Sequence, residues 1–202
     1  YVVDEVFRQG QYDRDPAYVT RPGWTVVDLG ANAGVFTVQA AQRGGRVLAV
    51  EPNPDCYARL CTNVAANGCT DRVTALCLAV SDVVARGQLH VERGGTTGGT
   101  VSVERDGTLE VTTLDRAIAA YDVACVDLLK VDIEGAEAGA LRGASTTLAR
   151  TRRVIAEYHS RDLLDASPAL ADQLAPQVLA AAQADDQHLT SVEQEGLPAA
   201  DD

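Results

Sequence analysis

A glycine-containing turn and an acidic residue stand at the spacing that a nucleoside site requires. The apolar run of residues 24–29 leads into the segment DLGANAG at residues 28–34, and a second apolar run ends at Glu51, 21 residues after Gly30. In a parallel α/β sheet, ligands bind beyond the carboxyl ends of the strands. A glycine turn there lets the backbone approach a ligand, and an acid about 20 residues further on can accept both hydroxyls of a ribose. The pattern predicts a site for an adenosine-containing cofactor.

The residue types in this turn distinguish between cofactors. A dinucleotide fingerprint has glycine at the position of Asn32, where the missing side chain clears space for the pyrophosphate. Asp28 adds negative charge close to any phosphate. A cationic ligand without phosphate suits both residues, and S-adenosylmethionine has a sulfonium, an ammonium and a ribose. We therefore predict S-adenosylmethionine; the simplest alternative is a tight strand-to-helix turn with a solvated Glu51.

Short apolar runs alternate with helical patterns along most of the chain. Strands are predicted at residues 24–29, 46–51, 73–80, 125–133 and 153–158, and helices at residues 34–42, at residues 54–67 and from the fourth run through Ala149. Because runs that are apolar on both faces are separated by helices, we expect an α/β fold with a mostly parallel sheet and helices on both faces.

The remaining segments fit less regular elements. Residues 86–113 hold glycine-containing turns between short alternating segments and too few apolar residues for a core of their own, so we expect a hairpin-like insertion. Residues 168–184 have a helical pattern with a break at Pro176, and residues 189–193 are expected to form a last strand. Residues 1–195 are expected to form a single domain, followed by an acidic tail at residues 196–202.

Composition argues against several classes of protein. The chain has 202 residues, with 17 Lys and Arg against 29 Asp and Glu, and a formal net charge of −12. Because so acidic a surface repels nucleic acid and anionic membranes, we expect neither as a partner. No run approaches the roughly 18 apolar residues of a membrane span. Five cysteines without a C-x-x-C pair predict reduced thiols in a cytoplasmic protein rather than a zinc site or a disulfide framework.

The ordered motifs of the chain resemble those of one family. Like the FkbM family of S-adenosylmethionine-dependent methyltransferases, the chain carries in order VVDLGANAGVFTVQAA, VLAVEPNP, ARLCTNVAANG, AVSD, TTLDRAI, DLLKVDIEGAEAGALRGA and VIAEYH, between about residue 12 and residue 159. A series of ordered motifs is more specific than a single glycine loop. The resemblance implies a seven-strand, Rossmann-like class I methyltransferase fold, and O-methylation of a hydroxyl on a small natural product or sugar.

The resemblance also implies roles for individual residues. Eight of them belong to the cofactor site: Asp28, Gly30, Asn32 and Gly34 in the turn, Glu51 at the ribose, Ser81 and Asp82 near the adenine, and Asp132 at the mouth. One feature departs from the family pattern. The family's fold ends in an antiparallel strand pair, and beyond Glu195 no second apolar run can supply it. We expect this last pair to be incomplete or irregular.

Charged residues at the ends of two later runs could take the proton of an acceptor hydroxyl. Lys130, Asp132 and Glu134 alternate at period two and share one side, and a charged triplet that ends an apolar run is costly without a function. Glu134 would equally suit the start of the following helix. His159, after the next run, titrates near neutral pH and could act as a base or pair with a carboxylate. The candidate catalytic residues are His159, Asp132 and Glu134.

Two alternatives stay open. The proton could pass to His159 without a metal, or Mg²⁺ bound by Asp132 and the Glu157/His159 pair could lower the pKa of the hydroxyl. We predict the metal-free route, because the Asp-Asn pair of the catechol-type methyltransferases is missing. The alternatives to a methyltransferase are an NAD-dependent oxidoreductase and a non-catalytic partner subunit with the methyltransferase fold.

Overall fold

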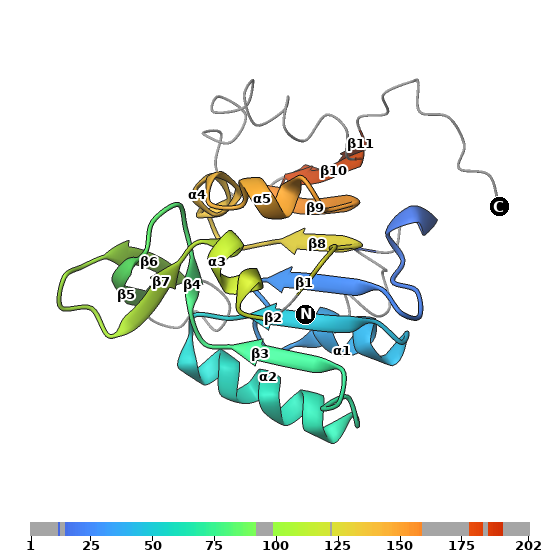
Figure 1. Cartoon of the computed structure of the whole chain (residues 1–202), viewed down its shortest axis with the longest axis horizontal. Coiled ribbons are helices and arrows are strands. Elements are labelled where there is room, and N and C mark those ends of the chain that lie inside the picture. The colour runs from blue at the N-terminus through green and yellow to red at the C-terminus, as the bar shows by residue number, and fades with distance from the viewer. Residues whose placement is uncertain are drawn as a thin grey trace.

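A seven-stranded, mostly parallel sheet forms the centre of the protein (Figure 1). The computed structural model describes residue 12 and residues 15–91, 99–121, 123–158, 178–183 and 186–191. The strand order is β11-β10-β9-β8-β1-β2-β3, and every neighbouring pair is parallel except β10 and β11. The strands are β1 (Thr25–Leu29), β2 (Arg46–Val50), β3 (Val73–Leu76), β8 (Leu128–Val131), β9 (Arg153–Tyr158), β10 (Val178–Gln183) and β11 (Asp186–Ser191). The predicted α/β class and parallel sheet are confirmed.

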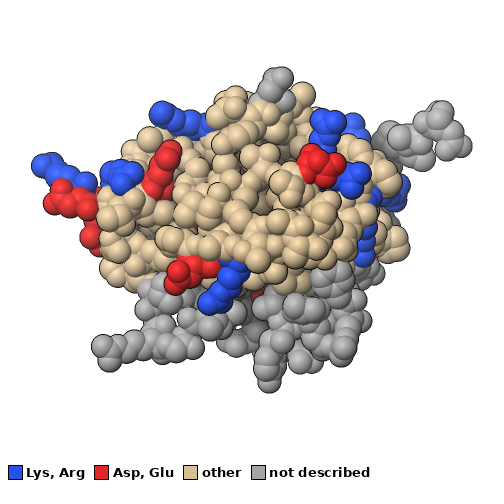
Figure 2. All heavy atoms as spheres, turned by 90° about the horizontal axis from the view of Figure 1, so that it is seen from below, with Lys and Arg blue, Asp and Glu red and all other residues tan. Residues whose placement is uncertain are grey.

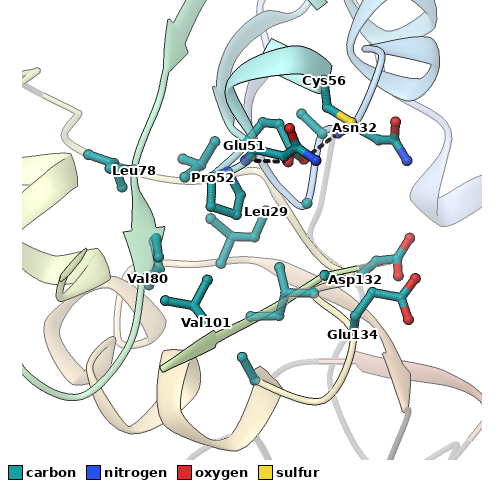
Figure 3. Close-up of a pocket in the computed structure, with 18 of the residues that line it drawn as sticks. Leu29, Asn32, Glu51, Pro52, Cys56, Leu78, Val80, Val101, Asp132 and Glu134 are labelled. Carbon is teal, nitrogen blue, oxygen red and sulfur yellow. Dashed lines mark hydrogen bonds between the residues drawn. The ribbon is translucent and has the colours of Figure 1, made fainter. Parts of the chain in front are cut away.

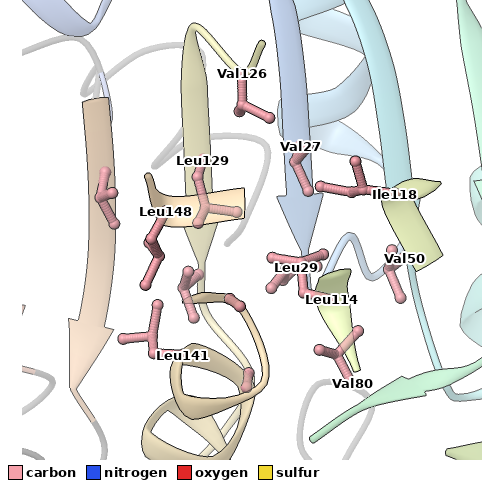
Figure 4. Close-up of a cluster of buried hydrophobic side chains, with 14 of the residues drawn as sticks. Val27, Leu29, Val50, Val80, Leu114, Ile118, Val126, Leu129, Leu141 and Leu148 are labelled. Carbon is pink, nitrogen blue, oxygen red and sulfur yellow. The ribbon is translucent and has the colours of Figure 1, made fainter. Parts of the chain in front are cut away.

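Helices cover both faces of this sheet, because successive strand residues point to opposite sides. One face carries α1 (Val35–Gln42) and α2 (Pro54–Ala66), and the other carries α3 (Leu114–Ala119), α4 (Glu137–Arg142) and α5 (Ser145–Leu148); a 3-10 helix, Pro16–Tyr18, precedes β1. Figure 4 shows the α3–α5 face, where Val27 and Leu129 of the sheet belong to one buried cluster with Ile118 and Leu148 of the helices. None of the described helices has the length and apolar character that crossing a membrane requires.

A second, smaller sheet stands at the carboxyl ends of the main strands. Its order is β4-β7-β5-β6, with β4 (Ala79–Val80), β5 (Ala85–Val91), β6 (Gly99–Val103) and β7 (Leu109–Thr112). In Figure 1 this sheet lies on the side toward which the arrows of β1 and β8 point. Residues 86–113, expected to form a hairpin-like insertion, thus contribute three strands to a sheet that also includes β4.

The strand expected at residues 73–80 is two strands in two different sheets. β3 ends at Leu76, whose carbonyl accepts the N–H of Glu51 at 3.0 Å, and β4 begins at Ala79, which pairs with β7. Residues 77 and 78 carry the chain from one sheet to the other. Both strands are built from apolar residues, so the apolar run continues through residues 77 and 78. Its periodicity therefore does not reveal that β3 and β4 are separate strands.

The helix expected to run through Ala149 is interrupted between α4 and α5. Gly143 lies at the break, and a Cβ atom there would fall on the backbone carbonyl of Ser81. Glycine therefore lets the end of α4 pack directly against the chain that leaves β4. The break comes from a contact between distant segments, which a helical pattern in the sequence does not contain.

The C-terminal strands also correct the sequence analysis. Residues 178–183, expected inside a helix, form β10, because pairing with β9 and β11 at the sheet edge overrides the helix preference of alanine. The predicted last strand is present at residues 189–191 within β11, whereas residues 168–177 and 192–193 lie outside the described residues. The antiparallel pair is supplied before Glu195, and its register shifts between Ala182 and Gln183.

The turn after β1 depends on a glycine for steric reasons. Gly30 has φ +77°, and a Cβ atom there would fall on the carbonyl oxygen of Asp132. The N–H of Asp132 donates to the carbonyl of Leu29 at 3.1 Å. Glycine thus allows the ends of β1 and β8 to approach each other. This role is additional to the one expected from the sequence, in which the glycine turn lets the backbone approach a ligand.

A buried ion pair joins the same two strands. Asp28 and Lys130 lie opposite each other in the β1–β8 register, with 3.1 Å between Asp28 Oδ1 and Lys130 Nζ. Both are buried, at 0% and 3% exposure. The Thr37 hydroxyl of α1 donates to Asp28 Oδ2 at 2.6 Å, and Lys130 Nζ donates to the carbonyl of Gly30 at 3.3 Å. The only lysine of the chain therefore stands in the core beneath the turn.

The collision at Gly30 predicts a stability difference between two glycine variants. Gly23 also has a positive φ, +84°, but a Cβ atom there would meet nothing within 4 Å. We expect Gly23→Ala to lower the free energy of unfolding by about 1–2 kcal/mol, the cost of the left-handed backbone alone. Gly30→Ala should cost about 2–5 kcal/mol, since overpacking adds to that strain. Urea denaturation of both variants measures the difference, and equal losses would contradict the steric argument.

The buried ion pair predicts that replacing the lysine alone destabilises the protein more than replacing both members of the pair. Lys130→Met leaves the Asp28 carboxylate buried without its cation, and we expect the free energy of unfolding to fall by roughly 3–5 kcal/mol. The double variant Asp28→Asn/Lys130→Met should recover part of that loss, because no charge is then left buried. Urea denaturation of the wild type, both single variants and the double variant completes the cycle. A double variant no more stable than Lys130→Met would refute this account.

Candidate active site

A cavity of about 700 Å³ opens at the carboxyl ends of the main strands, between them and the second sheet (Figure 3). Its walls come from the turn after β1, the end of β2, strand β4, strands β5–β7 and the segment after β8. Six residues predicted from the sequence line it: Gly30, Asn32, Glu51, Ser81, Asp132 and Glu134. Pockets of this size bury drug-sized ligands, and the position is the one where open α/β sheets bind theirs.

Glu51 is held in place by two backbone N–H groups. Its Oε2 accepts from the N–H of Asn32 and its Oε1 from the N–H of Asn53, each at 2.8 Å. The residue is 7% exposed and lines the cavity. Burial raises the pKa of Glu51, although both N–H groups favour the charged form. Since each carboxylate oxygen can accept more than one hydrogen bond, the oxygens can accept from a ligand hydroxyl as well.

The turn between β1 and α1 is fixed from several sides. Asn32 has φ +50°, a conformation that asparagine tolerates, and in it the Asn32 N–H meets Glu51. Asn63 of α2 donates through Nδ2 to the carbonyl of Ala33 at 2.8 Å. Gly34 does not line the cavity, because the space of its missing side chain is filled by Leu60 of α2. The turn therefore presents Asn32 to the cavity, and Gly34 serves the packing of α1 on α2.

Asp132 is held by a tyrosine and by the buried lysine. The Tyr12 hydroxyl donates to Asp132 Oδ2 at 3.1 Å, and Lys130 Nζ lies 3.4 Å from the same oxygen. Lys130 Nζ also lies 5.4 Å from the centroid of the Tyr12 ring and 5.9 Å from that of Phe36. Both contacts act on one oxygen of Asp132, so the carboxylate has a fixed orientation at the cavity wall.

The protonation states in this cluster follow from its charges. Burial alone would lower the pKa of Lys130, but the carboxylates of Asp28 and Asp132 outweigh burial and raise it well above its ordinary value. Burial also raises the pKa of Tyr12. The Lys130 cation lowers this pKa, and the carboxylates of Asp132 and Glu157 raise it further. Lys130 is therefore a cation and Tyr12 a neutral hydroxyl donor at neutral pH.

Two further carboxylates stand at this end of the cavity. Glu134 is exposed, has φ +53°, and extends in the same direction as Asp132 in Figure 3. Glu157 of β9 also lines the cavity. The helix-start role considered for Glu134 is filled by Glu137, which is buried and accepts through Oε1 from the N–H groups of Ile133 and Gly135, at 3.3 and 2.9 Å. Glu134 lines the cavity instead.

The remaining predicted residues lie in different surroundings. Ser81 lines the cavity, whereas Asp82 does not and forms an ion pair with Arg142 at 2.9 Å. The hydrogen bond from Arg142 lowers the pKa of Asp82. Asp28 lies below the cavity as the partner of Lys130. His159 lies outside the described residues.

Two features of this site go beyond what the sequence predicts in detail. The contact of Tyr12 with Asp132 joins residues 120 positions apart, so no local pattern could reveal it. The apolar side chains of the second sheet, such as Leu89 and Val101, could not be specified from the sequence, because this segment was expected to form a hairpin or loop and not part of a sheet. Its alternating apolar residues at 87–91 and 99–103 were the available signal.

Comparison with known proteins identifies the family. The family model described as "Methyltransferase FkbM domain" matches residues 28–176. Hexuronic acid methyltransferase AglP of Haloferax volcanii is 29% identical over 138 residues, which are 66% of this chain and 55% of AglP. The chain therefore spans little more than half the length of AglP. The 31-O-demethyl-FK506 methyltransferase FkbM of Streptomyces tacrolimicus is 28% identical over 197 residues, covering 80% of this chain and 75% of that protein.

A solved structure agrees with the fold. The crystal structure of a candidate rRNA methylase from Clostridium thermocellum superposes with a TM-score of 0.51 over 81% of this chain and 78% of that chain, at 13% identity. At this identity the likeness shows a shared Rossmann-like architecture and carries no information on substrate. The length and position of the family match, from the end of β1 to beyond β9, decide the classification: the chain belongs to the FkbM methyltransferase domain family.

Proposed function

We propose that the chain transfers a methyl group from S-adenosylmethionine to a hydroxyl of a small molecule. The observation that carries the proposal is the Glu51 carboxylate, buried at the cavity wall with its two oxygens fixed by the N–H groups of Asn32 and Asn53. A carboxylate fixed at the end of the second strand suits the two hydroxyls of a ribose.

The donor set of the cavity fits this cofactor. Glu51 would hold the ribose, Asp132 and the turn at Asn32 would face the methionine part, and Ser81 would lie near the adenine. Among the lining residues that the structure describes, Lys130 is the one cation, and it is paired with Asp28 and Asp132. A phosphate-bearing dinucleotide would lack a cationic partner there, whereas a sulfonium and an ammonium match the carboxylates. When bound, S-adenosylmethionine supplies an electrophilic methyl group.

The chain contributes alignment and charge to the transfer. Tyr12 and Lys130 fix Asp132, so its carboxylate needs little reorganisation when a ligand binds. A base must take the hydroxyl proton, and we assign this role to His159. Asp132 and Glu134, which line the cavity, would assist as acidic residues. We propose a route without a metal, because the Asp-Asn pair of the catechol-type methyltransferases is missing from the sequence.

Names of relatives support a hydroxyl acceptor. One is a 31-O-demethyl-FK506 methyltransferase, and a second, the 2-O-methyltransferase NoeI of Sinorhizobium fredii, is 26% identical over 72% of this chain and 67% of that protein. Both names specify transfer to oxygen. Because identity is low, the acceptor is inferred for this chain as a class, a hydroxyl on a natural product or sugar.

The assignment of Glu51 predicts the cofactor affinity of a variant. Glu51→Ala should weaken binding of S-adenosylhomocysteine by about 10–100-fold, since two charge-assisted hydrogen bonds to the ribose are lost. The exposed Asp71 lies just before β3, at the amino ends of the parallel strands and away from the cavity. It provides the control Asp71→Ala, which should bind normally. Titration calorimetry, with circular dichroism to verify folding, measures both. Wild-type protein that binds NAD but not S-adenosylhomocysteine would refute the methyltransferase proposal.

The proton route predicts two further results. With an acceptor found by transfer of tritiated methyl groups, activity should survive EDTA, because no metal takes part. His159→Ala should lower the rate by about 10²–10⁴-fold with unchanged S-adenosylhomocysteine affinity, since the base acts on the acceptor. Activity that is lost on chelation and restored by Mg²⁺ would reverse the choice of route. A His159→Ala rate equal to the wild-type rate would exclude His159 as the base.

A further inference from the structure

The second sheet has one apolar and one polar face. Leu89 of β5 pairs with Val101 of β6, and both side chains line the cavity. The polar face carries His90, whose Nε2 lies 2.7 Å from the hydroxyl of Ser102, and that hydroxyl donates to Glu104 at 2.6 Å. Since strand residues alternate between faces, the polar cluster and the apolar pair lie on opposite sides. The hairpin therefore directs its apolar side chains toward the cavity.

This apolar wall is only partly covered by the protein. Leu89 and Val101 are half-buried, and Val103, which also lines the cavity, is 58% exposed. Behind them the cluster of the second sheet contains only Ala79, Leu109 and Val111 as fully buried members. Apolar side chains that remain accessible inside a cavity favour an apolar ligand, because their burial releases water.

The residues assigned to the cofactor do not include this wall, so it is available to the second substrate, the methyl acceptor. The residues assigned to the cofactor lie after β1, β2, β4 and β8, and none of them belongs to β5 or β6. In Figure 3, Val80 and Val101 lie on one side of the cavity, and Asp132 and Glu134 lie on the other. The acceptor would therefore have β6 at its side and the carboxylates near its reacting hydroxyl.

The charged side chains that line the cavity narrow the range of possible acceptors further. Asp132, Glu134 and Glu157 all line the cavity, and its lysine is already neutralised by Asp28 and Asp132. An acceptor with a carboxylate or phosphate would meet negative charge, and no described lining residue has a cation to spare for it. Like charges in a partly desolvated cavity repel strongly.

We infer that Leu89 and Val101 form the acceptor wall and select an uncharged hydroxyl compound with an apolar segment. The inference rests on the proposed function, since it presumes that the acceptor shares the cavity with the cofactor. The inferred acceptor differs from the hexuronic acid in the name of AglP, because a hexuronic acid is an anion at neutral pH. The specificity residues are then on the inserted sheet, and the carboxylates exclude acidic acceptors.

Three glycosides test the inference: octyl glucoside, methyl glucoside and octyl glucuronide, each below its micelle concentration. Their binding is measured by titration calorimetry on the full chain saturated with S-adenosylhomocysteine. We expect octyl glucoside to bind at least about tenfold more tightly than methyl glucoside, because the alkyl chain meets the apolar wall. It should also bind at least about tenfold more tightly than octyl glucuronide, because of the carboxylates.

Variants of Val101 test whether the preference for octyl glucoside arises from β6. Val101→Ser should reduce the ratio of octyl to methyl glucoside affinity, and Val101→Arg should improve the binding of octyl glucuronide. Val84, 56% exposed between β4 and β5 and not lining the cavity, provides the control Val84→Ser, which should keep the wild-type ratios. All three variants should bind S-adenosylhomocysteine as the wild type does.

The outcomes separate this inference from the proposed function. Wild-type protein that does not bind S-adenosylhomocysteine refutes the proposed function. If the cofactor product binds, then equal affinity for both glucosides, binding of octyl glucuronide as tight as that of octyl glucoside, or no binding of octyl glucoside at millimolar concentration overturns the acceptor wall. Val101→Ser with unchanged ratios would overturn the assignment to β6.

Discussion

One buried lysine between two aspartates determines how the site is arranged. A charge this deeply buried is stable only beside an opposite charge, so β1 and β8 must align with Asp28 opposite Lys130. The same lysine reaches Asp132, which Tyr12 holds from a distant part of the chain. The position of Asp132 at the cavity wall is therefore a consequence of core electrostatics. A shift of β8 by one residue would move Lys130 to the opposite face and leave Asp28 unpaired.

Steric fit at Gly30 acts together with this attraction. The ion pair draws the strands together, and the missing side chain of Gly30 lets the backbone of Asp132 come close enough. Glu51, fixed by two N–H groups, completes a rigid half of the cavity. The other half is built by the second sheet, whose side chains can change without disturbing the ion pair. Such a division lets a family keep its cofactor site while its acceptors differ.

The sequence predicted those elements whose signal is local. β1, β2, β8 and β9 are short apolar runs, and α1 and α2 have helical patterns with clear ends, so their positions were predicted to within a few residues. The division of residues 73–80 into two sheets, the break at Gly143 and the strand at residues 178–183 depend on contacts with distant segments. Residue types alone do not encode these contacts, and propensity then favours the wrong element.

The same distinction applies to the site. The position of Glu51 and Asp132 at the cavity wall could be predicted, because the end of a buried parallel strand is a local property and ligands bind at those ends. The resemblance placed Asp28 in the cofactor turn. The structure places this residue beneath the cavity as the partner of Lys130, because strand residues alternate in direction and this one points into the core. Its negative charge still serves the site through Lys130, whose neutralisation leaves the cavity without a spare cation among its described residues. An acidic residue near a glycine turn can therefore change the charge of a cavity that it does not itself line.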